Sequence, residues 1–154
     1  MSKPKIAFVV GHSNWGKSKT LRALTNGDRY KRRLSIQGVE FLIRRMSNDD
    51  LPKSFIRFME SVDPSSITAI IAALCPNFDD EEAATQSVLN QLRSKGYRLF
   101  FWVMEHQYRT NKAMSASDIS RLRKFGTVKV ISGVAEAASR ARDFRKFITD
   151  TVLA

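Results

Sequence analysis

The sequence predicts an α/β fold in which a mostly parallel sheet, with one antiparallel hairpin, is covered by helices on both faces. Three observations support this prediction. Short apolar runs alternate with segments of helical periodicity along the 154 residues. Several of these runs are apolar throughout, as in strands buried on both faces of a parallel sheet. No repeat and no Pro/Gly/Ser-rich linker interrupts the pattern, which indicates a single domain over residues 1–154.

The first half of the chain predicts one central strand, a hairpin and two helices. The apolar run Lys5–Val10 is suited to a central parallel strand. A helix should follow from Lys17 to about Thr25 and end at the glycine that comes next. Alternating apolar residues over 34–43 flank Gln37-Gly38, which predicts two strands joined by a tight turn. Apolar residues at helical spacing then predict a helix from about Asp50 to Glu60.

The second half predicts three more strands, at Ile67–Leu74, Tyr97–Met104 and Thr127–Ser132. The first is followed by acidic residues, and we expect Asp79 and Asp80 to cap a helix that begins there, because carboxylates stabilise the first turn.

Two further helices complete the predicted order. Ser115, with Asp118 three residues later, resembles a capping box for a short helix that stops at Gly126. The last helix should run from Ala135 to about Val152.

The composition excludes several classes of protein. No apolar run is long enough to span a bilayer, and the segment before the first strand has no secretory pattern. Cys75 is the single cysteine, which excludes an internal disulfide and a cysteine-rich zinc site. These features favour a cytoplasmic protein. The 26 Lys and Arg against 15 Asp and Glu give a net charge of +11, which would attract nucleoside phosphates, nucleic acid or another polyanion.

One motif points to a phosphate-binding loop. The segment Gly11–Ser18 fits G-x-x-x-x-G-K-[ST] between a predicted strand and a predicted helix. Gly11 permits a sharp turn and Gly16 a close approach of the backbone to phosphate, while N–H groups from about Asn14 to Ser18 can surround the β-phosphate. Lys17 would contact β- and γ-phosphate oxygens, and the Ser18 hydroxyl would bind Mg²⁺. The expected nucleotide-binding residues are Gly11, Ser13, Asn14, Trp15, Gly16, Lys17, Ser18 and Lys19.

The loop resembles the Walker A motif of P-loop NTPases. The wider stretch GHSNWGKSKTLRALTNG, with the following RRLSIQGVEFLI, is similar to the opening of GTPases of the translation-factor and related classes. The resemblance covers most of the chain in the order of elements, although the first loop alone is motif-specific. It implies a three-layer P-loop NTPase-type fold that binds ATP or GTP, with Mg²⁺ as cofactor.

Two motifs of these GTPases are altered. Where the family has D-x-x-G, which holds the magnesium shell and senses the γ-phosphate, this chain has Arg44-Arg45-Met46-Ser47. Where the family reads guanine with N-K-x-D, this chain has Met104-Glu105-His106-Gln107, and the later Asn111-Lys112-Ala113-Met114 lacks the aspartate. The sequence therefore does not support guanine specificity.

Nearby carboxylates are candidates to replace the missing one. We expect Asp49 and Asp50 to act with Lys17 in catalysis, and Asp49 to bind the metal with Ser18. Asp79 is a further candidate, because ligands of parallel sheets lie beyond the carboxyl ends of strands. The alternative reading of all three aspartates is that they cap the helices that follow. Trp15 has two readings as well: stacking on the base or packing against neighbouring structure.

Basic residues form two clusters, which fit either ordinary solvated faces or a surface that grips nucleic-acid phosphates. The first lies around the hairpin and the second on the last helix. Their members are Arg29, Lys31, Arg32, Arg33, Arg44 and Arg45, and Arg140, Arg142, Arg145 and Lys146.

Three functions are consistent with the sequence. The leading hypothesis is a Mg²⁺-dependent hydrolase of ATP or GTP. The second is a kinase that transfers the γ-phosphoryl group to a small acceptor. The third is a catalytically degenerate module that binds nucleotide and acts through its basic surface.

Overall fold

The computed structural model describes residues 3–154. Its six strands form one sheet, and five α-helices and a π-helical turn, Ile148–Val152, surround it. The strands are β1 Lys5–Val10, β2 Arg33–Ile36, β3 Val39–Arg44, β4 Ala69–Leu74, β5 Arg98–Met104 and β6 Gly126–Ile131. The helices are α1 Lys17–Leu24, α2 Pro52–Ser61, α3 Thr85–Ser94, α4 Ala116–Arg123 and α5 Ala137–Phe147.

The sheet has the strand order β2-β3-β4-β1-β5-β6. All neighbours are parallel except β2 and β3, which form the predicted antiparallel hairpin. Its two-residue turn, Gln37-Gly38, has positive φ at both positions, as the right-handed twist of a hairpin requires. Strands β1, β4 and β5 lie in the middle of the sheet and are almost entirely buried, which explains their unbroken apolar sequences.

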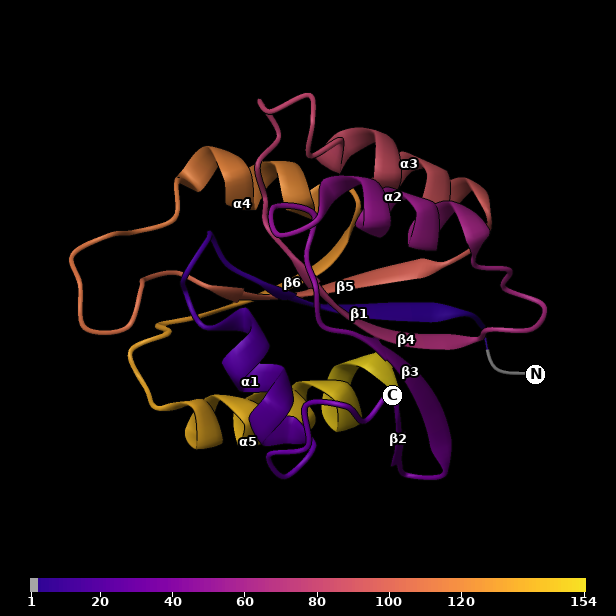
Figure 1. Cartoon of the computed structure of the whole chain (residues 1–154), viewed down its shortest axis with the longest axis horizontal. Coiled ribbons are helices and arrows are strands. Elements are labelled where there is room, and N and C mark those ends of the chain that lie inside the picture. Colours follow the sequence, from indigo (N-terminus) through magenta and orange to yellow (C-terminus); the bar gives the residue numbers. More distant parts are fainter. Residues whose placement is uncertain (1–2) are drawn as a thin grey trace.

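Helices cover both faces of the sheet, so the molecule has three layers (Figure 1). Helices α2, α3 and α4 lie on one face, and α1 and α5 pack together on the other. The predicted three-layer α/β fold, with a mostly parallel sheet and one hairpin, is confirmed. No helix in residues 3–154 combines the length and the apolar character needed to cross a membrane.

The strand register brings several loops to one edge of the sheet. Val10 lies opposite both Leu74 and Val103, and Met104 lies opposite Ile131. The loops that follow β1, β4, β5 and β6 therefore begin at the same level. Strand β3 ends beside them with Arg44 opposite Ala72. This is the edge at which ligands of parallel α/β sheets bind.

One expectation from the sequence needs correction, and one feature of the strand order bears on the site. The helix predicted to start at Asp79 begins instead at Thr85, because Ala84 adopts a left-handed conformation (φ 51°) that a helix cannot include. Asp80 shapes the preceding turn by accepting from the Glu82 N–H (3.0 Å). In addition, the strand beside β1 at this edge is β4 and not β3, so the segment aligned with D-x-x-G is separated from the loop after β1 by one strand.

Candidate functional site

The loop between β1 and α1 wraps around the side chain of Lys17. The Lys17 ammonium donates to the backbone oxygens of Gly11 (2.8 Å) and His12 (2.9 Å), and the side chain is 6% exposed. Gly16 has φ 90°, which turns the chain directly into the helix. A Cβ on Gly11 would lie 2.9 Å from Met104 Cε and 3.2 Å from Trp15 Cβ, so a larger residue there would have to displace the Met104 side chain. The backbone conformation thus favours glycine at position 16, and close packing favours it at position 11.

The start of α1 presents main-chain donors that no described residue satisfies. Within residues 3–154, the N–H groups of Gly16, Lys17, Ser18 and Lys19 have no hydrogen-bond acceptor. Together with the positive end of the helix dipole, such free donors favour an anion. A pocket of about 280 Å³ opens there, between the loop and Asp50. The residues that line it include Asn14, Gly16, Lys17, Ser18 and Lys19, all of them predicted binding residues.

Asp49 and Asp50 both lie at this site. The Asp49 carboxylate is 3.7 Å from the Lys17 ammonium and 15% exposed, and Asp50 lines the pocket beside Ser18. Neither carboxylate caps α2, whose first turn has no side-chain cap. They instead order their own turn, because the Ser47 hydroxyl donates to both carboxylates and the Ser47 N–H donates to Asp50 (3.1 Å). The reading of these two aspartates as caps of α2 is therefore wrong.

Buried Asn48 fixes the position of these two aspartates, and sequence reasoning missed it. Its side-chain oxygen accepts from the Cys75 N–H (2.8 Å), and its amide donates to the Cys75 oxygen and to Thr85 Oγ1 (3.0 Å each). The side chain thus pairs with the chain end of β4 as another strand would. The pairing joins the turn after β3 to the loop after β4, the strand that lies between β3 and β1.

Arg140 of α5 packs against the loop at Gly16. It is 4% exposed, and its guanidinium donates to Thr20 Oγ1 (2.9 Å) and to the Ala135 oxygen (2.6 Å). A Cβ on Gly16 would lie 2.6 Å from its NH2 atom. Burial lowers the pKa of Arg140, although the nearby Tyr108 opposes this shift. Arg140 therefore does not belong to a solvated face, unlike the exposed Arg142, Arg145 and Lys146.

Helical spacing could have identified Arg140 as an inward-facing residue. It lies one turn before Phe144 and two turns before Ile148, both of which are fully buried.

The side chains of Trp15 and His12, both in the loop, contact each other. Trp15 is 4% exposed and meets the His12 ring edge-on at 5.1 Å, so its side chain packs in the core and cannot stack on a base. Only its backbone can contribute to a phosphate site. The His12 ring lies 3.8 Å from Cys75 Sγ on one side and 3.8 Å from the Asp118 carboxylate on the other.

The titration behaviour of these groups excludes a cysteine nucleophile. Burial raises the pKa of the Cys75 thiol to about 11, so the thiol is protonated at neutral pH. Burial, reinforced by the charge of Lys17, lowers the pKa of His12 in spite of Asp118 and Asp49. His12 is therefore mainly neutral at pH 7.

Asp79 does not join the loop in this structure. It is exposed and pairs with Arg121 of α4 (3.1 Å). Of the three candidate aspartates, Asp49 and Asp50 are thus the two that lie at the loop. Together with the Ser18 hydroxyl they form a set of hard oxygen donors, which suits Mg²⁺ with several waters retained. No cluster of three or more His, Cys, Asp or Glu side chains in residues 3–154 forms a metal cage.

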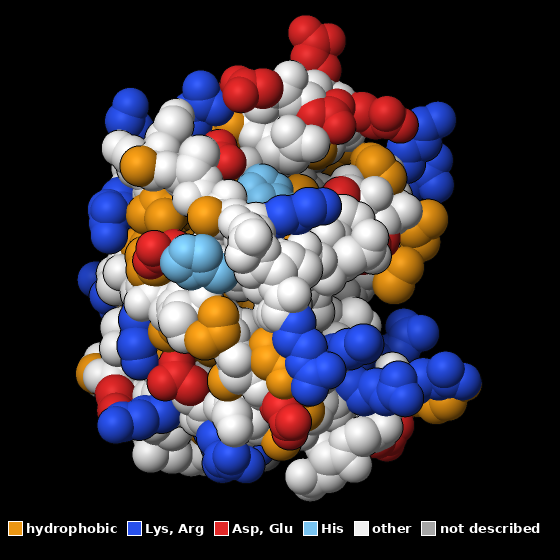
Figure 2. Space-filling view, turned by 90° about the vertical axis from the view of Figure 1, so that its left-hand side faces the viewer, with side chains coloured by type: hydrophobic (Ala, Val, Ile, Leu, Met, Phe, Trp, Pro, Cys, Tyr) orange, Lys and Arg blue, Asp and Glu red, His pale blue; other side chains and the backbone are white. Residues whose placement is uncertain are grey.

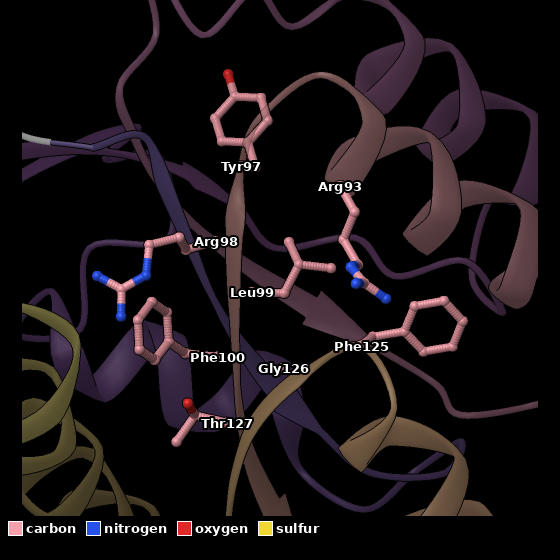
Figure 3. Close-up of a pocket in the computed structure, with 8 residues that line it drawn as sticks. All are labelled: Arg93, Tyr97, Arg98, Leu99, Phe100, Phe125, Gly126 and Thr127. Atoms are coloured by element: carbon pink, nitrogen blue, oxygen red, sulfur yellow. The ribbon is translucent and has the colours of Figure 1, made fainter.

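Figure 2 looks onto the edge where the parallel strands end, and Lys and Arg side chains gather on the lower right of this face. A second pocket, of about 390 Å³, is lined by Arg29, Arg32, Arg44 and Arg45 among others, and it shares Ser18 with the pocket at the loop. A third pocket, of about 250 Å³, lies at the opposite end of the sheet, where β5 and β6 begin (Figure 3).

Comparison with known proteins adds little to this geometry. No protein-family model matches the sequence, and no curated protein sequence matches it. Among solved structures, the chain is similar to the crystal structure of APE1195, with 10% identity, a TM-score of 0.49 and coverage of 99% of this chain and 98% of that one. It is also similar to an unliganded sugar kinase from Janibacter sp. HTCC2649, with 13% identity, a TM-score of 0.48 and coverage of 96% of both chains. With both TM-scores below 0.5, neither neighbour indicates an activity for this chain.

Proposed function

We propose that this protein binds a nucleoside triphosphate, ATP or GTP, together with Mg²⁺ at the loop Gly11–Lys19 and promotes transfer of the γ-phosphoryl group. One observation carries the proposal. The N–H groups of Gly16 to Lys19, free of acceptors among the described residues, surround a pocket next to a buried ammonium group. Free donors and an ammonium in a pocket of this size suit a polyphosphate.

Each group at the site has a proposed role. The main-chain donors and Lys17 would stabilise negative charge on the β- and γ-phosphates, where phosphoryl transfer gains most from electrostatic stabilisation. Mg²⁺ would be held by Ser18 and by Asp49 or Asp50, and when bound it neutralises phosphate charge. Asp49 would also orient Lys17, since the two side chains already lie within 3.7 Å.

The destination of the phosphoryl group separates two candidates. In the first, water attacks and the protein is a hydrolase. In the second, a small acceptor attacks and the protein is a kinase. The pocket that shares Ser18 with the phosphate site favours the second, because it offers space for an acceptor beside the γ-phosphate.

Calorimetric titration with ATP and with GTP, with and without Mg²⁺, tests the proposal. Lys17→Ala should weaken binding by about 100-fold or more, which corresponds to about 2.7 kcal/mol. Lys124→Ala is the matched control: it removes an exposed ammonium just before β6, at the opposite end of the sheet, and it should change the affinity less than about threefold. Equal binding by wild type and Lys17→Ala, or no binding by wild type, would contradict the proposal.

The metal site is tested in the same titrations. Asp49→Asn should lower the gain in affinity from Mg²⁺ by about tenfold, because it removes a charged oxygen ligand and the partner of Lys17. Asp79→Asn, which removes an exposed carboxylate paired with Arg121, should leave that gain unchanged. If both variants retain the full effect of Mg²⁺, Asp49 is not a ligand.

A further inference from the structure

The second pocket at the carboxyl edge of the sheet is lined by four arginines. Arg29 and Arg32 come from the link between α1 and β2, and Arg44 and Arg45 from the end of β3. Its volume of about 390 Å³ lies within the range of small-molecule sites, about 300–1,000 Å³. Ser18 forms part of its wall and of the wall of the phosphate pocket, so ligands in the two pockets would be neighbours.

No carboxylate in the described part of the chain forms an ion pair with these four arginines. Arg44 donates to Ser54 Oγ (2.5 Å), and its guanidinium lies 5.3 Å from the centre of the Phe58 ring. Arg45 donates only to neutral oxygens: Thr25 Oγ1 and the backbone oxygens of Lys31 and Asp28. These contacts fix the guanidinium groups in place without neutralising them.

The Asp28 carboxylate acts on Arg45, whose pKa burial nevertheless lowers, so the charge of the cluster is only partly compensated. Two further features concern how Arg44 and Arg45 are paired. The Nε atoms of Arg44 and Arg45 are buried and have no hydrogen-bond partner in residues 3–154. Burial and the charge of Arg32 lower the pKa of Arg44, so Arg32 and Arg44 are close enough to repel each other. An anion between them would remove this repulsion, and a guanidinium group binds phosphate oxygens through two parallel N–H bonds.

The same pocket has apolar surface beside its charges. Tyr30 is 75% exposed and Met46 is 40% exposed, and both line the pocket. They are two of the four large hydrophobic side chains that are exposed in the described residues. Such surface suits the ring or apolar body of a small molecule whose anionic group lies among the arginines.

We propose that this pocket binds a small phosphomonoester, which accepts the γ-phosphoryl group of the nucleotide at the loop. The inference rests on the function proposed above. An oxygen of the acceptor's phosphate attacks the γ-phosphorus and forms a phosphoanhydride bond. The bond from the γ-phosphorus to the β–γ bridging oxygen breaks, and the nucleoside diphosphate leaves with that electron pair.

The lining of the pocket favours this acceptor over an alcohol. A hydroxyl acceptor would need a base to take its proton, and the lining contains no carboxylate and no histidine. A phosphate oxygen is already anionic at neutral pH, so no proton has to be removed. Four guanidinium groups also match a phosphate dianion better than a single carboxylate.

Binding is tested on protein saturated with Mg²⁺ and the β,γ-imido analogue of ATP, which occupies the loop without transferring phosphate. AMP, GMP, CMP, UMP and ribose 5-phosphate are then titrated in a calorimeter. At least one should bind with one-to-one stoichiometry, and Arg32→Gln should weaken that binding by about tenfold or more. The Arg32 side chain is exposed and forms no hydrogen bond or ion pair with the described residues, and the substitution keeps the backbone oxygen that accepts from the Ile43 N–H, so this variant should fold normally. Arg98→Gln, which removes the same charge at the other end of the sheet, is the control and should bind as wild type does.

Transfer is then measured with γ-³²P-labelled ATP and the probe that binds best. Label should appear on that probe, and Arg32→Gln should slow its appearance about tenfold while the ATP affinity changes less than about threefold. An equal loss of ATP affinity in Arg32→Gln would assign the arginine to the γ-phosphate and overturn the proposal. The proposal would also be overturned if none of the five phosphomonoesters bound the wild-type protein. This includes the outcome in which an oligonucleotide binds, in a manner that depends on Arg32, and the phosphomonoesters do not. If the β,γ-imido analogues of ATP and of GTP both fail to bind, the proposed function fails. The same phosphomonoesters, titrated into nucleotide-free protein, then test the arginine pocket separately.

Discussion

Arginines line pockets at both ends of the sheet, and their surroundings differ in a way that bears on function. At the amino end, the guanidinium of Arg98 lies 5.2 Å from the centre of the Phe100 ring, and that of Arg93 lies 5.9 Å from Phe125 and donates to the Lys124 oxygen (Figure 3). At the carboxyl end, arginines lie beside the free N–H groups of α1 and a buried lysine.

The difference shows that arginine content alone does not indicate an anion site. The amino-end arginines cover aromatic rings with their long side chains, as charged residues commonly do on protein surfaces. Arg44 at the carboxyl end also lies over an aromatic ring, but there four arginines line one pocket beside the first turn of α1. Convergence of several donors on one pocket distinguishes a binding site from ordinary basic surface, and the two ends can be compared directly with matched variants.

The largest expected effect is on nucleotide affinity, in a comparison of Gly16 at the carboxyl end of the sheet with Gly96 at the amino end. Gly16→Ala places a methyl group 2.6 Å from the buried Arg140 NH2 atom at φ 90°, so the loop and Arg140 must both move. We expect nucleotide affinity to fall about 100-fold or more, measured by calorimetry.

Gly96→Ala provides the control at the amino end. Gly96 also has positive φ (103°), but its added Cβ would have no atom within 4 Å. Both variants should lose about 1–2 kcal/mol of stability from the left-handed backbone, whereas Gly96→Ala should bind nucleotide as wild type does. Equal affinities for the two variants would show that Arg140 and Gly16 do not shape the site.

A smaller effect is expected where Asn48 joins β3 and β4. Asn48→Ala leaves the buried N–H of Cys75 without its acceptor, and an unsatisfied group of this kind costs about 1–3 kcal/mol, whereas the Cys75 oxygen keeps the Asn77 N–H as a donor (2.9 Å). We therefore expect a loss of about 1–3 kcal/mol in the free energy of unfolding, measured with urea. Asn90→Ala, on the exposed side of α3, should change stability by less than about 0.5 kcal/mol. If Asn48→Ala also changed the free energy of unfolding by less than about 0.5 kcal/mol, the hydrogen bonds between Asn48 and Cys75 would contribute little to stability.

Local pattern was sufficient to predict much of the fold. The apolar run of β1, the hairpin turn at Gln37-Gly38 and the Ser115 cap of α4 depend on residues close in sequence, and the structure contains all three; the Asp118 N–H donates to Ser115 Oγ at 3.1 Å. The start of α3 was missed because the left-handed Ala84 is a non-glycine residue that carries no turn signal.

The site was less accessible to sequence reasoning, because its geometry depends on distant partners. Gly11, Gly16 and Lys17 could be predicted, since the motif is contiguous. Asn48 could not, because its partners lie 27 and 37 residues away across a strand order that the sequence did not reveal. The four-arginine pocket likewise forms only when the link after α1 meets the end of β3.

The smallest expected effect is on the pH dependence of stability and concerns His12. This residue belongs to the loop at the carboxyl end of the sheet. Because burial lowers its pKa in the folded state, the unfolded chain binds a proton at higher pH than the folded chain does. The stability from neutral His12 is thus present above the unfolded pKa of about 6.5 and is lost as the pH falls below it. Urea titrations at about pH 7.5 and about pH 5.5 should therefore show a larger loss of stability for wild type than for His12→Gln. The same loss in both proteins would show that the His12 ring accepts a proton in the folded state as readily as in the unfolded chain, because Asp118 and Asp49 would then balance the effect of burial.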